Sequence, residues 1–509
     1  MSLRVLYAGC RAVTVQLGDE GLYELPAPAA LRLDGKDAGT ARTVIVTLWH
    51  LSPGCEHTLE ADLPGGTERI AFRTAEERVT FDVRRFGARG DGEHEDTAAI
   101  QAAILACPDH GRVLVPRGVY PVLPLFLRSH ITLELAEGAV LRLIPDRDRF
   151  PILPGTTLTA DGREDVCLGT WEGDPLDSFA SLITGVEVED VTLCGQGVLD
   201  GGGAEGDWWK DAKRKRGAWR GNLLFLCRCA DIRVQGLTFR NSPAWNLHPY
   251  FSRGLRFLGM KIEAPADSPN TDGFDPESCE DVLLAGTHFS VGDDCVAVKS
   301  GKLYMGRRYH TPNSRMEIAH CLMEDGHGGV TVGSEMAGGI RGLWVHDCVM
   351  RRTDRGLRIK TRRGRGRDGV IDDVVFERIR MERVRAPFVA NSLYYCDPDG
   401  HSPYVQSTEP QPVDERTPRI GTLTFRHIDA DGAACAGWFL GLPEQPIEAV
   451  VLEDVTVRCD PDAVPFQPAM ADCVPAVSRT GFVLRNVAEV RMEGVTVEGC
   501  EGEAVTRAE

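Results

Sequence analysis

The chain has 509 residues, of which 42% are hydrophobic and 26% charged, a composition typical of a globular protein and unlike that of a disordered one. Its formal net charge of −18 argues against a nucleic-acid partner and against adhesion to an anionic membrane, so a polyanionic ligand would need a local basic patch. A chain of this length exceeds the usual size of one hydrophobic core unless that core grows by repetition.

The N-terminal residues carry no recognisable export signal. The first ten contain one arginine and an apolar run too short for the hydrophobic region of a signal peptide. No stretch approaches the roughly eighteen continuous apolar residues of a transmembrane helix. We therefore expect a cytoplasmic protein whose cysteines are free, buried thiols. Cys227 and Cys229 form a Cys-x-Cys, but no second pair lies at zinc-site spacing, so we expect no metal site there.

Residues 1–76 are predicted to form a small β-sandwich. Alternating apolar strands such as residues 43–48 are separated by turn sequences at 52–54 and 64–66. Residues 51–59 resemble the strand-turn-strand segment of fibronectin type III modules, with His57 where those modules usually carry tyrosine. The linker would follow at residues 73–77, and residues 77–509 would form the second domain.

A helix is predicted directly after the Phe-Gly-Ala-x-Gly-Asp-Gly stretch of residues 86–92. Asp96 is placed to serve as its N-cap, and Ile100 with Ile104 makes an i, i+4 apolar pair, so we expect a short amphipathic helix over residues 96–106. A solenoid needs its end covered, and such a helix is suited to cap it.

Short β-strand patterns recur along the rest of the chain with almost no helical pattern between them. From Ile232 to Val374 successive strands begin about 23, 27, 34, 27 and 31 residues apart. Periods of this size signal stacked repeats, and irregular ones made of short strands favour a right-handed parallel β-helix, hence an all-β protein. A propeller is the alternative, but its blades would be longer and each would need four strands.

Three of these coils carry a second strand whose alternation indicates which side chains point outward. In residues 295–299 the two valines would face the core while Lys299 faces out, and residues 329–333 repeat the pattern. In residues 356–360 the same alternation places Arg358 and Lys360 together on the outer face. Because stacked strands lie about 4.8 Å apart, residues scattered between positions 270 and 360 would form one patch roughly 15 Å long.

Four polar motifs fall at the same edge of consecutive coils: Asn270-Thr-Asp272, Gly292-Asp-Asp294, Gly326-His327-Gly328 and Arg358-Ile-Lys360. Two carboxylates held close together cannot both ionise freely, so one keeps a proton while another stays ionised. Glycoside hydrolysis requires such an acid and base, and three aspartates on two adjacent coils leave room for a water, which favours inversion. Each motif alone is an ordinary turn or surface sequence, and no loop has EF-hand spacing for calcium; the shared register is what indicates a site.

In this order and approximate spacing the four motifs resemble the signature of the polygalacturonases, glycoside hydrolase family 28. The resemblance extends from about Phe81 onward. It implies a right-handed parallel β-helix and inverting hydrolysis of α-1,4-linked galacturonate, without a cofactor or metal ion. It also implies roles for individual residues. Asp293 would be the general acid, Asp272 and Asp294 would hold and activate the water, and His327 would support the carboxylates. The substrate carboxylate would be bound by Arg358 and Lys360, together with Asn270 and either Tyr394 or Tyr395.

The surroundings of these motifs favour an acidic oligo- or polysaccharide as the partner. Residues 351–367 place nine cations in seventeen positions, a cluster that would focus a polyanion. Taken alone, the cluster would also suit a nucleic-acid patch or a mobile surface loop. Long non-repetitive segments at 145–178, 202–221 and 391–418 interrupt the coils and could wall off a groove. Tryptophans in the first two would stack on sugar faces or pin the loops: Trp171, Trp208, Trp209 and Trp219.

A closed groove admits only a chain end, so we expect exo-cleavage that releases galacturonic acid or a short product. Exo-acting members of the family with a fibronectin-like N-terminal module resemble this layout. Two rival functions fit the same fold. One is a calcium-dependent pectate lyase, and the other is a non-catalytic carbohydrate-binding β-helix, which would not need paired aspartates. The sequence leaves open whether homogalacturonan, rhamnogalacturonan or xylogalacturonan is the polymer.

Overall fold

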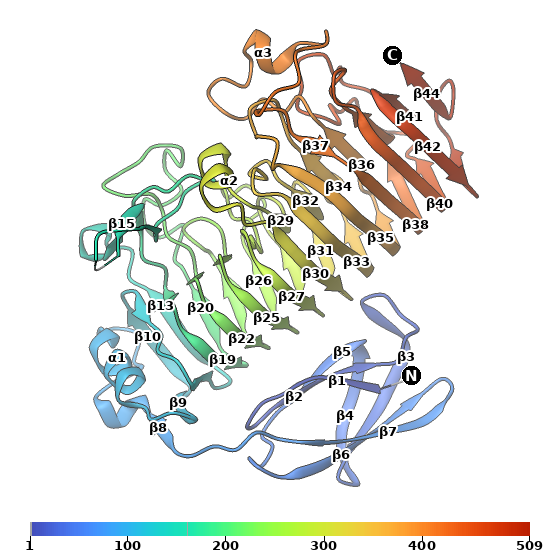
Figure 1. Ribbon diagram of the computed structural model, residues 1–509. Helices are drawn as coiled ribbons and strands as arrows, with labels where there is room; N and C mark the ends of the chain where they lie inside the picture. Colours follow the sequence, from blue (N-terminus) through green and yellow to red (C-terminus); the bar gives the residue numbers. More distant parts are fainter. Residues whose placement is uncertain (1–2, 160, 509) are drawn as a thin grey trace.

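The computed structural model describes residues 3–159 and 161–508, which form a small N-terminal β-module followed by a long solenoid (Figure 1). In the module a three-stranded antiparallel sheet, order β1-β2-β5, accompanies a four-stranded one, order β4-β3-β6-β7. Their strands are β1 (Leu3–Ala8), β2 (Val13–Leu17), β3 (Glu24–Leu33), β4 (Lys36–Thr43), β5 (Ile45–Leu48), β6 (Glu56–Leu63) and β7 (Gly66–Arg73). Alternate apolar side chains of both sheets share one core.

His57, on β6, lies where fibronectin-like modules usually carry tyrosine. Its ring nitrogens contact a carboxylate oxygen of Asp34 at 2.7 Å and the backbone oxygen of Ser52 at 3.4 Å. The tyrosine of such modules reaches a backbone group a few residues upstream in the same way. The imidazole therefore joins β6 to the segments that carry Asp34 and Ser52.

Parallel strands stack coil upon coil in the rest of the chain, the right-handed parallel β-helix that the sequence predicted. One sheet of 22 strands runs the length of the solenoid, with two strands from many of the coils. Its members are β8 (Thr80–Asp82), β9 (Gly111–Val115), β10 (Gly118–Val122), β12 (Ile131–Leu135), β13 (Ala139–Leu143), β19 (Glu189–Gly195), β20 (Val198–Asp200), β22 (Ala230–Gln235), β23 (Thr238–Arg240), β25 (Arg253–Leu258), β26 (Lys261–Glu263), β27 (Glu280–Ala285), β28 (His288–Ser290), β30 (Asn313–Ala319), β31 (Leu322–Glu324), β33 (Ile340–Arg351), β35 (Val370–Glu382), β37 (Arg419–Ile420), β38 (Thr422–Ala433), β40 (Ile447–Cys459), β42 (Val487–Glu493) and β43 (Thr496–Glu498).

A second parallel face closes each coil and carries the polar motifs. It comprises β11 (Leu125–Phe126), β18 (Ile183–Val186), β21 (Leu224–Cys227) and β24 (Leu247–Tyr250), then β29 (Val296–Val298), β32 (Val330–Val332), β34 (Arg355–Lys360), β36 (Ala386–Asn391), β39 (Cys435–Leu440), β41 (Thr480–Arg485) and β44 (Val505–Ala508). Phe274 bridges Leu247 on one side and Val296 on the other, so the two groups of strands continue one face. One apolar cluster fills the interior from Val83 to Leu484.

The predicted register of this face is confirmed. Val296 pairs with Val330 and Val330 with Leu357, and all three side chains are buried in the core. Arg358 and Lys360 occur in the same strand at alternate positions and contact the same carboxylate outside that core. Lys299 also lies outside the apolar cluster, but it is only 3% exposed, and it contacts Asp275, Glu335 and Trp245.

Helices are few and short: α1 (Thr97–Ala106), α2 (Leu303–Tyr309), α3 (Pro403–Gln406), η1 (Val83–Phe86) and η2 (Arg147–Arg149). Helix α1 covers the first coils as predicted, with Ile100 and Ile104 fully buried. Asp96 is the N-cap residue by position, yet its carboxylate makes no bond to the helix. It accepts instead from the backbone N–H groups of Arg89 and Gly90, at 2.7 and 3.0 Å, and so fixes the glycine-rich turn that precedes the helix.

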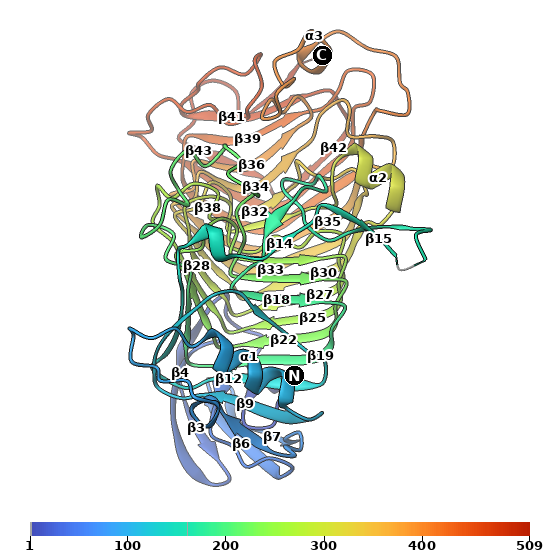
Figure 2. The same cartoon turned by 90° about the vertical axis from the view of Figure 1, so that its left-hand side faces the viewer.

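The module lies along one flank of the β-helix, and the long loops lie on the opposite side, near β15 (Thr156–Leu158) and α2 (Figures 1 and 2). Two short antiparallel pairs stiffen these loops: β14 (Ile152–Leu153) with β17 (Ser178–Phe179), and β15 with β16 (Asp165–Cys167). No helix in the described ranges is both long and apolar enough to cross a membrane.

Candidate active site

Three carboxylates from two adjacent coils meet at the entrance to the second parallel face. Because Phe274 and Val296 are paired, Asp272 and Asp294 stand at the same place on neighbouring coils. Oxygen atoms of Asp272, Asp293 and Asp294 lie within 4.8 Å of one another. The next coil must leave space for them: a Cβ atom at Gly328 would lie 2.7 Å from an oxygen of Asp294. Glycine at position 328 therefore lets the carboxylate group assemble.

Asp294 is a fully buried anion with two cationic partners. Arg358 donates to its Oδ1 at 3.1 Å, and Lys360 donates to its Oδ2 at 2.9 Å. Burial disfavours the charge, but Lys360 and Arg358 outweigh it and hold the pKa of Asp294 well below its usual range. Lys360 and Arg358 therefore favour the ionised form of Asp294.

Asp272 is in the opposite situation. The residue is 5% exposed, and its Oδ1 has no hydrogen-bond partner. Burial raises the pKa of Asp272 well above that of an ordinary carboxyl group, and the nearby charges of Asp293 and Asp275 raise it further. A neutral carboxyl and an anion thus stand on neighbouring coils, which is the separation of ionisation states that acid–base catalysis needs.

Asp293 is the member of the trio that opens to solvent. Its side chain is 22% exposed, against 0% for Asp294. The Nδ1 atom of His327 lies 3.2 Å from Asp293 Oδ1, and this hydrogen bond, opposed by burial, raises the pKa of His327. The histidine that the resemblance assigned to the carboxylate group therefore contacts the accessible aspartate.

Asn270 is held by a buried arginine that the sequence analysis did not single out. Arg220, 4% exposed, donates to Asn270 Oδ1 at 2.7 Å and to the backbone oxygens of Pro243 and Pro269 at 2.8 and 3.1 Å. Burial lowers its pKa to about 10. Arg220 fixes the turn that presents Asn270 to the cleft, and its only sequence signal is its place at the end of a long basic loop.

Arg358 and Lys360 are brought to the trio, as expected, but they are 5% and 8% exposed and occupied by Asp294. The ring of Tyr394 lies over both cations, with its centroid 6.0 Å from the guanidinium carbon and 5.5 Å from Nζ. Tyr395 instead stacks on His401 at 4.5 Å. Of the two candidate tyrosines, Tyr394 is the one beside the site.

The prediction that residues 351–367 form a basic patch for a polyanion is wrong for most of their cations. Five of the arginines in this segment are at most 7% exposed, and they bind carboxylates or backbone oxygens: Arg355, Arg358, Arg362, Arg363 and Arg365. The partners come from loops up to 113 residues away in the sequence. The cluster holds the C-terminal loops to the β-helix.

The loop tryptophans contact protein. Trp171 lies parallel to Trp219 with the ring centroids 4.8 Å apart, and parallel to Trp245 with the centroids 6.0 Å apart. Trp208 is 1% exposed and packs under Arg147, with the guanidinium carbon 4.0 Å from the ring centroid. Trp209 donates from Nε1 to the backbone oxygen of Ser242 at 3.0 Å. In this conformation the tryptophans pin the loops.

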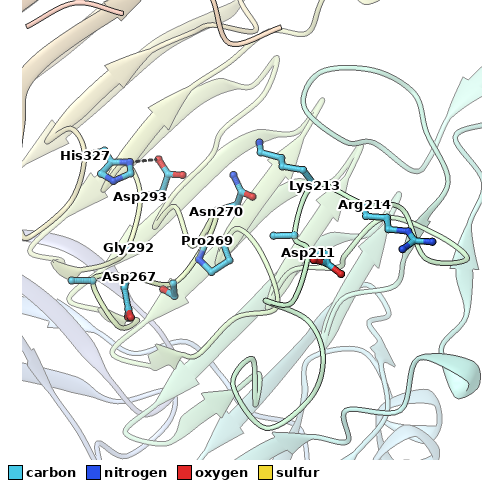
Figure 3. A pocket seen from close by; sticks show the side chains of 12 residues that line it. Asp211, Lys213, Arg214, Asp267, Pro269, Asn270, Gly292, Asp293 and His327 are labelled. Atoms are coloured by element: carbon cyan, nitrogen blue, oxygen red, sulfur yellow. Dashed lines mark hydrogen bonds and ion pairs between the residues drawn. The ribbon is translucent and has the colours of Figure 1, made fainter. Parts of the chain in front are cut away.

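An open cleft of about 680 Å³ leads to the exposed face of the trio (Figure 3). Asn270, Asp293 and His327 line one side of it. Residues 211–214 of the long loop line the other, including two cations that the sequence analysis did not select, Lys213 and Arg214. The basic run of residues 213–216 was the available signal.

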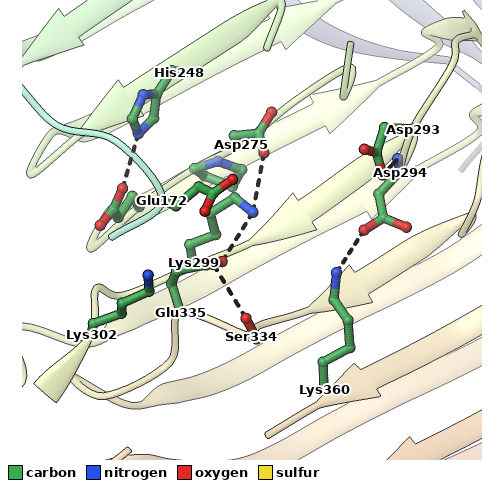
Figure 4. Close-up of polar contacts among 12 residues, drawn as sticks. Glu172, His248, Asp275, Asp293, Asp294, Lys299, Lys302, Ser334, Glu335 and Lys360 are labelled. Atoms are coloured by element: carbon green, nitrogen blue, oxygen red, sulfur yellow. Dashed lines mark hydrogen bonds and ion pairs between the residues drawn. The ribbon is translucent and has the colours of Figure 1, made fainter. Parts of the chain in front are cut away.

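A second charged cluster is buried beside the trio (Figure 4). The ammonium group of Lys299 lies 3.4 Å from Asp275 and 3.2 Å from Glu335, above the ring of Trp245 at 4.6 Å. Burial disfavours the charge of Lys299, but Glu335 and Asp275 raise its pKa well above the ordinary value. Burial raises the pKa of Asp275 well above that of an ordinary carboxyl group, although the charge of Lys299 opposes this.

Ion pairs join the long loops to each other over this cluster. Lys302, at the start of α2, lies 3.3 Å from Asp174 and 3.3 Å from Asp397, which belong to different loops. Lys213, in the 202–221 segment, lies 2.6 Å from Glu172, which belongs to the same 145–178 segment as Asp174. The three long loops predicted from the sequence are therefore connected at one place, on the same side of the β-helix as the trio.

The sequence profile of glycosyl hydrolases family 28 matches residues 143–408, a range that includes the trio, His327, Arg358, Lys360 and both candidate tyrosines. A probable polygalacturonase from Vitis vinifera is 32% identical over 381 residues, which cover 73% of this chain and 73% of that one. An endo-polygalacturonase from Pectobacterium carotovorum subsp. carotovorum is 29% identical over 313 residues, covering 58% of this chain and 72% of the relative.

A solved structure with a similar fold comes from Yersinia enterocolitica and is described as a family 28 exopolygalacturonase. It covers 100% of this chain and 98% of its own, with a TM-score of 0.71 and 19% sequence identity. At that identity the likeness concerns the fold, and it extends over the N-terminal module as well as the β-helix.

Proposed function

The chain belongs to glycosyl hydrolases family 28, and from that premise we propose that it hydrolyses α-1,4-linked galacturonate with inversion, cutting from a chain end. The observation that carries the proposal is the carboxylate trio, a solvent-facing Asp293 and the buried Asp272 and Asp294, with oxygens within 4.8 Å of one another. The pKa of Asp272 is raised by burial and that of Asp294 is lowered by Lys360 and Arg358. An acid, a base and a place for water are what cleavage of a glycosidic bond requires.

Asp293 is the general acid because it is the carboxyl group that a glycosidic oxygen in the cleft can reach. Asp272 and Asp293 are close enough for a proton to be held by the pair, and protonated Asp293 passes it to the leaving oxygen. The ionised Asp294 accepts a proton from the attacking water, whose oxygen forms the new bond to the anomeric carbon. At the end of the step Asp294 is protonated and Asp293 is ionised.

The water belongs between Asp272 and Asp294. Oxygens of all three carboxylates lie within 4.8 Å of one another, which is closer than the roughly 6.5 to 9.5 Å between the acid and base of many inverting enzymes. One water can nevertheless bridge two oxygens at this spacing with hydrogen bonds of about 2.8 Å. A third carboxylate also supports inversion, because a retaining enzyme needs only an acid and a nucleophile.

An acidic substrate is supported by the cations next to the trio. A sugar carboxylate entering beside Asp294 would share Arg358 and Lys360 with it, under the ring of Tyr394. Removing part of their charge from Asp294 would raise its pKa and strengthen it as a base. Binding of the correct sugar would in this way make Asp294 a stronger base toward the attacking water.

Exo-action is supported by the joined loops. Lys302 ties two of them together beside the trio, and the stacked tryptophans hold a third in place. If these joined loops close one end of the cleft, only a terminus of the polymer can enter, and the product released is short. Relatives with either an endo or an exo description match the chain, so the choice rests on these loops.

The test is product analysis with defined oligogalacturonates. We expect chromatography to show one short product from the first turnovers, and proton NMR to show the product anomer opposite to the α bond that is cut. Asp293→Asn should lower kcat by roughly 10² to 10⁴-fold. Rhamnogalacturonan and xylogalacturonan serve as parallel substrates.

Three outcomes would contradict the proposal in distinguishable ways. A product with the α anomer would replace inversion by retention, and early mixed oligomers would replace exo- by endo-cleavage. An unsaturated product that absorbs ultraviolet light and disappears with a chelator would identify a lyase.

A further inference from the structure

The cations near the trio are of two kinds. Arg358 and Lys360 are buried and already bound to Asp294. Lys213 and Arg214 are exposed on the loop that forms the opposite side of the cleft from Asp293 and His327 (Figure 3). A second sugar carboxylate in the cleft would therefore meet the loop cations first.

The loop that carries these cations is fixed at its base. Trp208 is buried, and Asp207 binds both Arg147, at 2.5 Å, and Arg216. The backbone N–H of Arg214 donates to the backbone oxygen of Asp211 at 2.8 Å, which shapes the tip into a turn. The tip is thus presented by an anchored segment, which lowers the entropy cost of using it as a binding surface.

Lys213 and Arg214 differ in the interaction partners that they already have. Lys213 lies 2.6 Å from Glu172, and its side chain is 64% exposed. Arg214 has no ion pair or side-chain hydrogen bond to any residue in the described ranges. The anions that line the same cleft are Asp211, whose charge is balanced by Arg216 at 2.9 Å, together with Asp267 and the catalytic Asp293. An unpaired guanidinium is suited to bind a planar carboxylate with two hydrogen bonds.

We propose that Arg214, assisted by Lys213, binds the carboxylate of a galacturonate unit other than the one held at Arg358 and Lys360, and so selects chains that are free of methyl esters on both units. This inference rests on the proposed function. A methyl ester removes the negative charge and one acceptor, so the loop would lose its attraction for that unit. Lys213 would exchange Glu172 for the substrate carboxylate.

Binding rather than turnover tests the inference. The Asp293→Asn variant is titrated by calorimetry with trigalacturonate and with its fully methyl-esterified form, and the changes Arg214→Ala and Lys213→Ala are then added singly. We expect Arg214→Ala to weaken binding of the acid about tenfold, as for the loss of a charge-assisted hydrogen bond. Binding of the ester should not change, and Arg214→Lys should keep part of the affinity.

Lys210→Ala is the matched control, because Lys210 is an exposed cation of the same loop that does not line the cleft. Equal losses for Arg214→Ala and Lys210→Ala, or equal losses with acid and ester, would overturn the inference. So would an effect of Arg214→Ala that persists at 1 M salt, where exposed charges are screened beyond about 3 Å.

Failure of the proposed function is read separately. The unmodified enzyme is assayed for hydrolysis of trigalacturonate in the same preparation. If it does not hydrolyse trigalacturonate, the proposed function is wrong, whereas the binding titrations still test the role of Arg214. Unfolding midpoints in urea show whether each variant is folded, and Arg214→Glu supplies a second substitution that should weaken acid binding more than Arg214→Ala does.

Discussion

Two aspartates that are adjacent in the sequence have different physical situations. Asp293 faces the cleft and contacts a half-exposed histidine, whereas Asp294 is buried between Arg358 and Lys360. Both are expected to be needed for turnover. Only Asp294 also neutralises two buried cations, so substitution of Asp294 should lower the stability of the fold more than substitution of Asp293.

We predict that Asp294→Asn lowers the free energy of unfolding by about 3 kcal/mol, because removing one partner of a buried ion pair leaves an uncompensated charge. Asp293→Asn should change it by less than about 0.5 kcal/mol. Urea unfolding followed by fluorescence measures both, with kcat measured on the same samples. Equal stability of the two variants would mean that Arg358 and Lys360 find other partners.

At the scale of residues, much of the site followed from the sequence because strand alternation and coil stacking are local rules. They placed Asp272 beside Asp294, and Arg358 beside Lys360. The sequence did not predict that Arg358 and Lys360 are buried. Arg358 is covered by Met470, whose sulfur it contacts at 3.1 Å across 112 positions of sequence, and no periodicity indicates where such a loop returns.

The strands of the long sheet carry another ionisable cluster, separate from the trio and from the Lys299 cluster. His346, on β33, contacts Asp347 at 2.6 Å and Glu317 at 3.4 Å, and Arg378 binds Asp347 from the next strand. Burial opposes the imidazolium, but the two carboxylates prevail and raise the pKa of His346 to about 9. The folded state therefore binds this proton more tightly than the unfolded chain, in which the pKa is about 6.5.

This shift predicts how stability depends on pH. A raised histidine pKa stabilises the fold fully below about pH 6.5, and the contribution is lost as pH rises to about 9. The wild type should exceed His346→Gln by about 2 kcal/mol at pH 6 and by little above pH 9. Urea midpoints at several pH values measure the difference. A constant difference across this range would show that His346 acts through packing alone.

The loops form the elements that set the mode of attack. Lys302→Met removes the cation that joins Asp174 to Asp397 while keeping a side chain of similar length. If this join blocks the groove, polygalacturonate should lose viscosity faster per bond cleaved and early products should become mixed. Arg307→Ala, an exposed residue of the same helix with a 3.5 Å partner in Glu415, is the control. A single product from both variants would place the block elsewhere.

Elements were predicted better than the contacts among them. The capping helix and the inward valines follow from short apolar patterns, whereas the joined loops depend on pairs such as Lys302 and Asp397, 95 positions apart. The basic segment at 351–367 shows the limit of composition as a guide. Its cations gather because acidic loops fold back onto them, and a count of charges does not reveal that.

At the scale of the whole molecule, the module docks on turns of the β-helix. Three residues at alternate positions near β5, Ile45, Thr47 and Trp49, meet successive turns at Gly286, Gly259 and Gly236. Tyr7 adds a hydrogen bond to Thr192 at 2.8 Å. The sequence predicted both domains but not this contact, because it joins segments about 190 to 240 positions apart in the chain.

The docking turns offer a matched pair of substitutions. A Cβ atom at Gly286 would lie 2.4 Å from Ile45, whereas at Gly259 the nearest atom, of Thr47, is 3.4 Å away. Both glycines have positive φ, so alanine at either costs about 1 kcal/mol of backbone strain. Gly286→Ala must also push the module away, so we predict a further loss of about 1 to 3 kcal/mol.

Proteolysis should report this second cost directly. If the module is lifted, the segment between β7 and β8, residues 74–79, should be cut faster in Gly286→Ala than in Gly259→Ala. Neither glycine lines the cleft, so kcat on oligogalacturonate should stay the same. Equal cutting in the two variants would mean that Ile45 yields without undocking. A fall in kcat specific to Gly286→Ala would instead show that the module supports the coils that hold the trio. Gly286 lies in the turn between β27 and β28, and these two strands lie between Asp272 and Asp293 in the sequence.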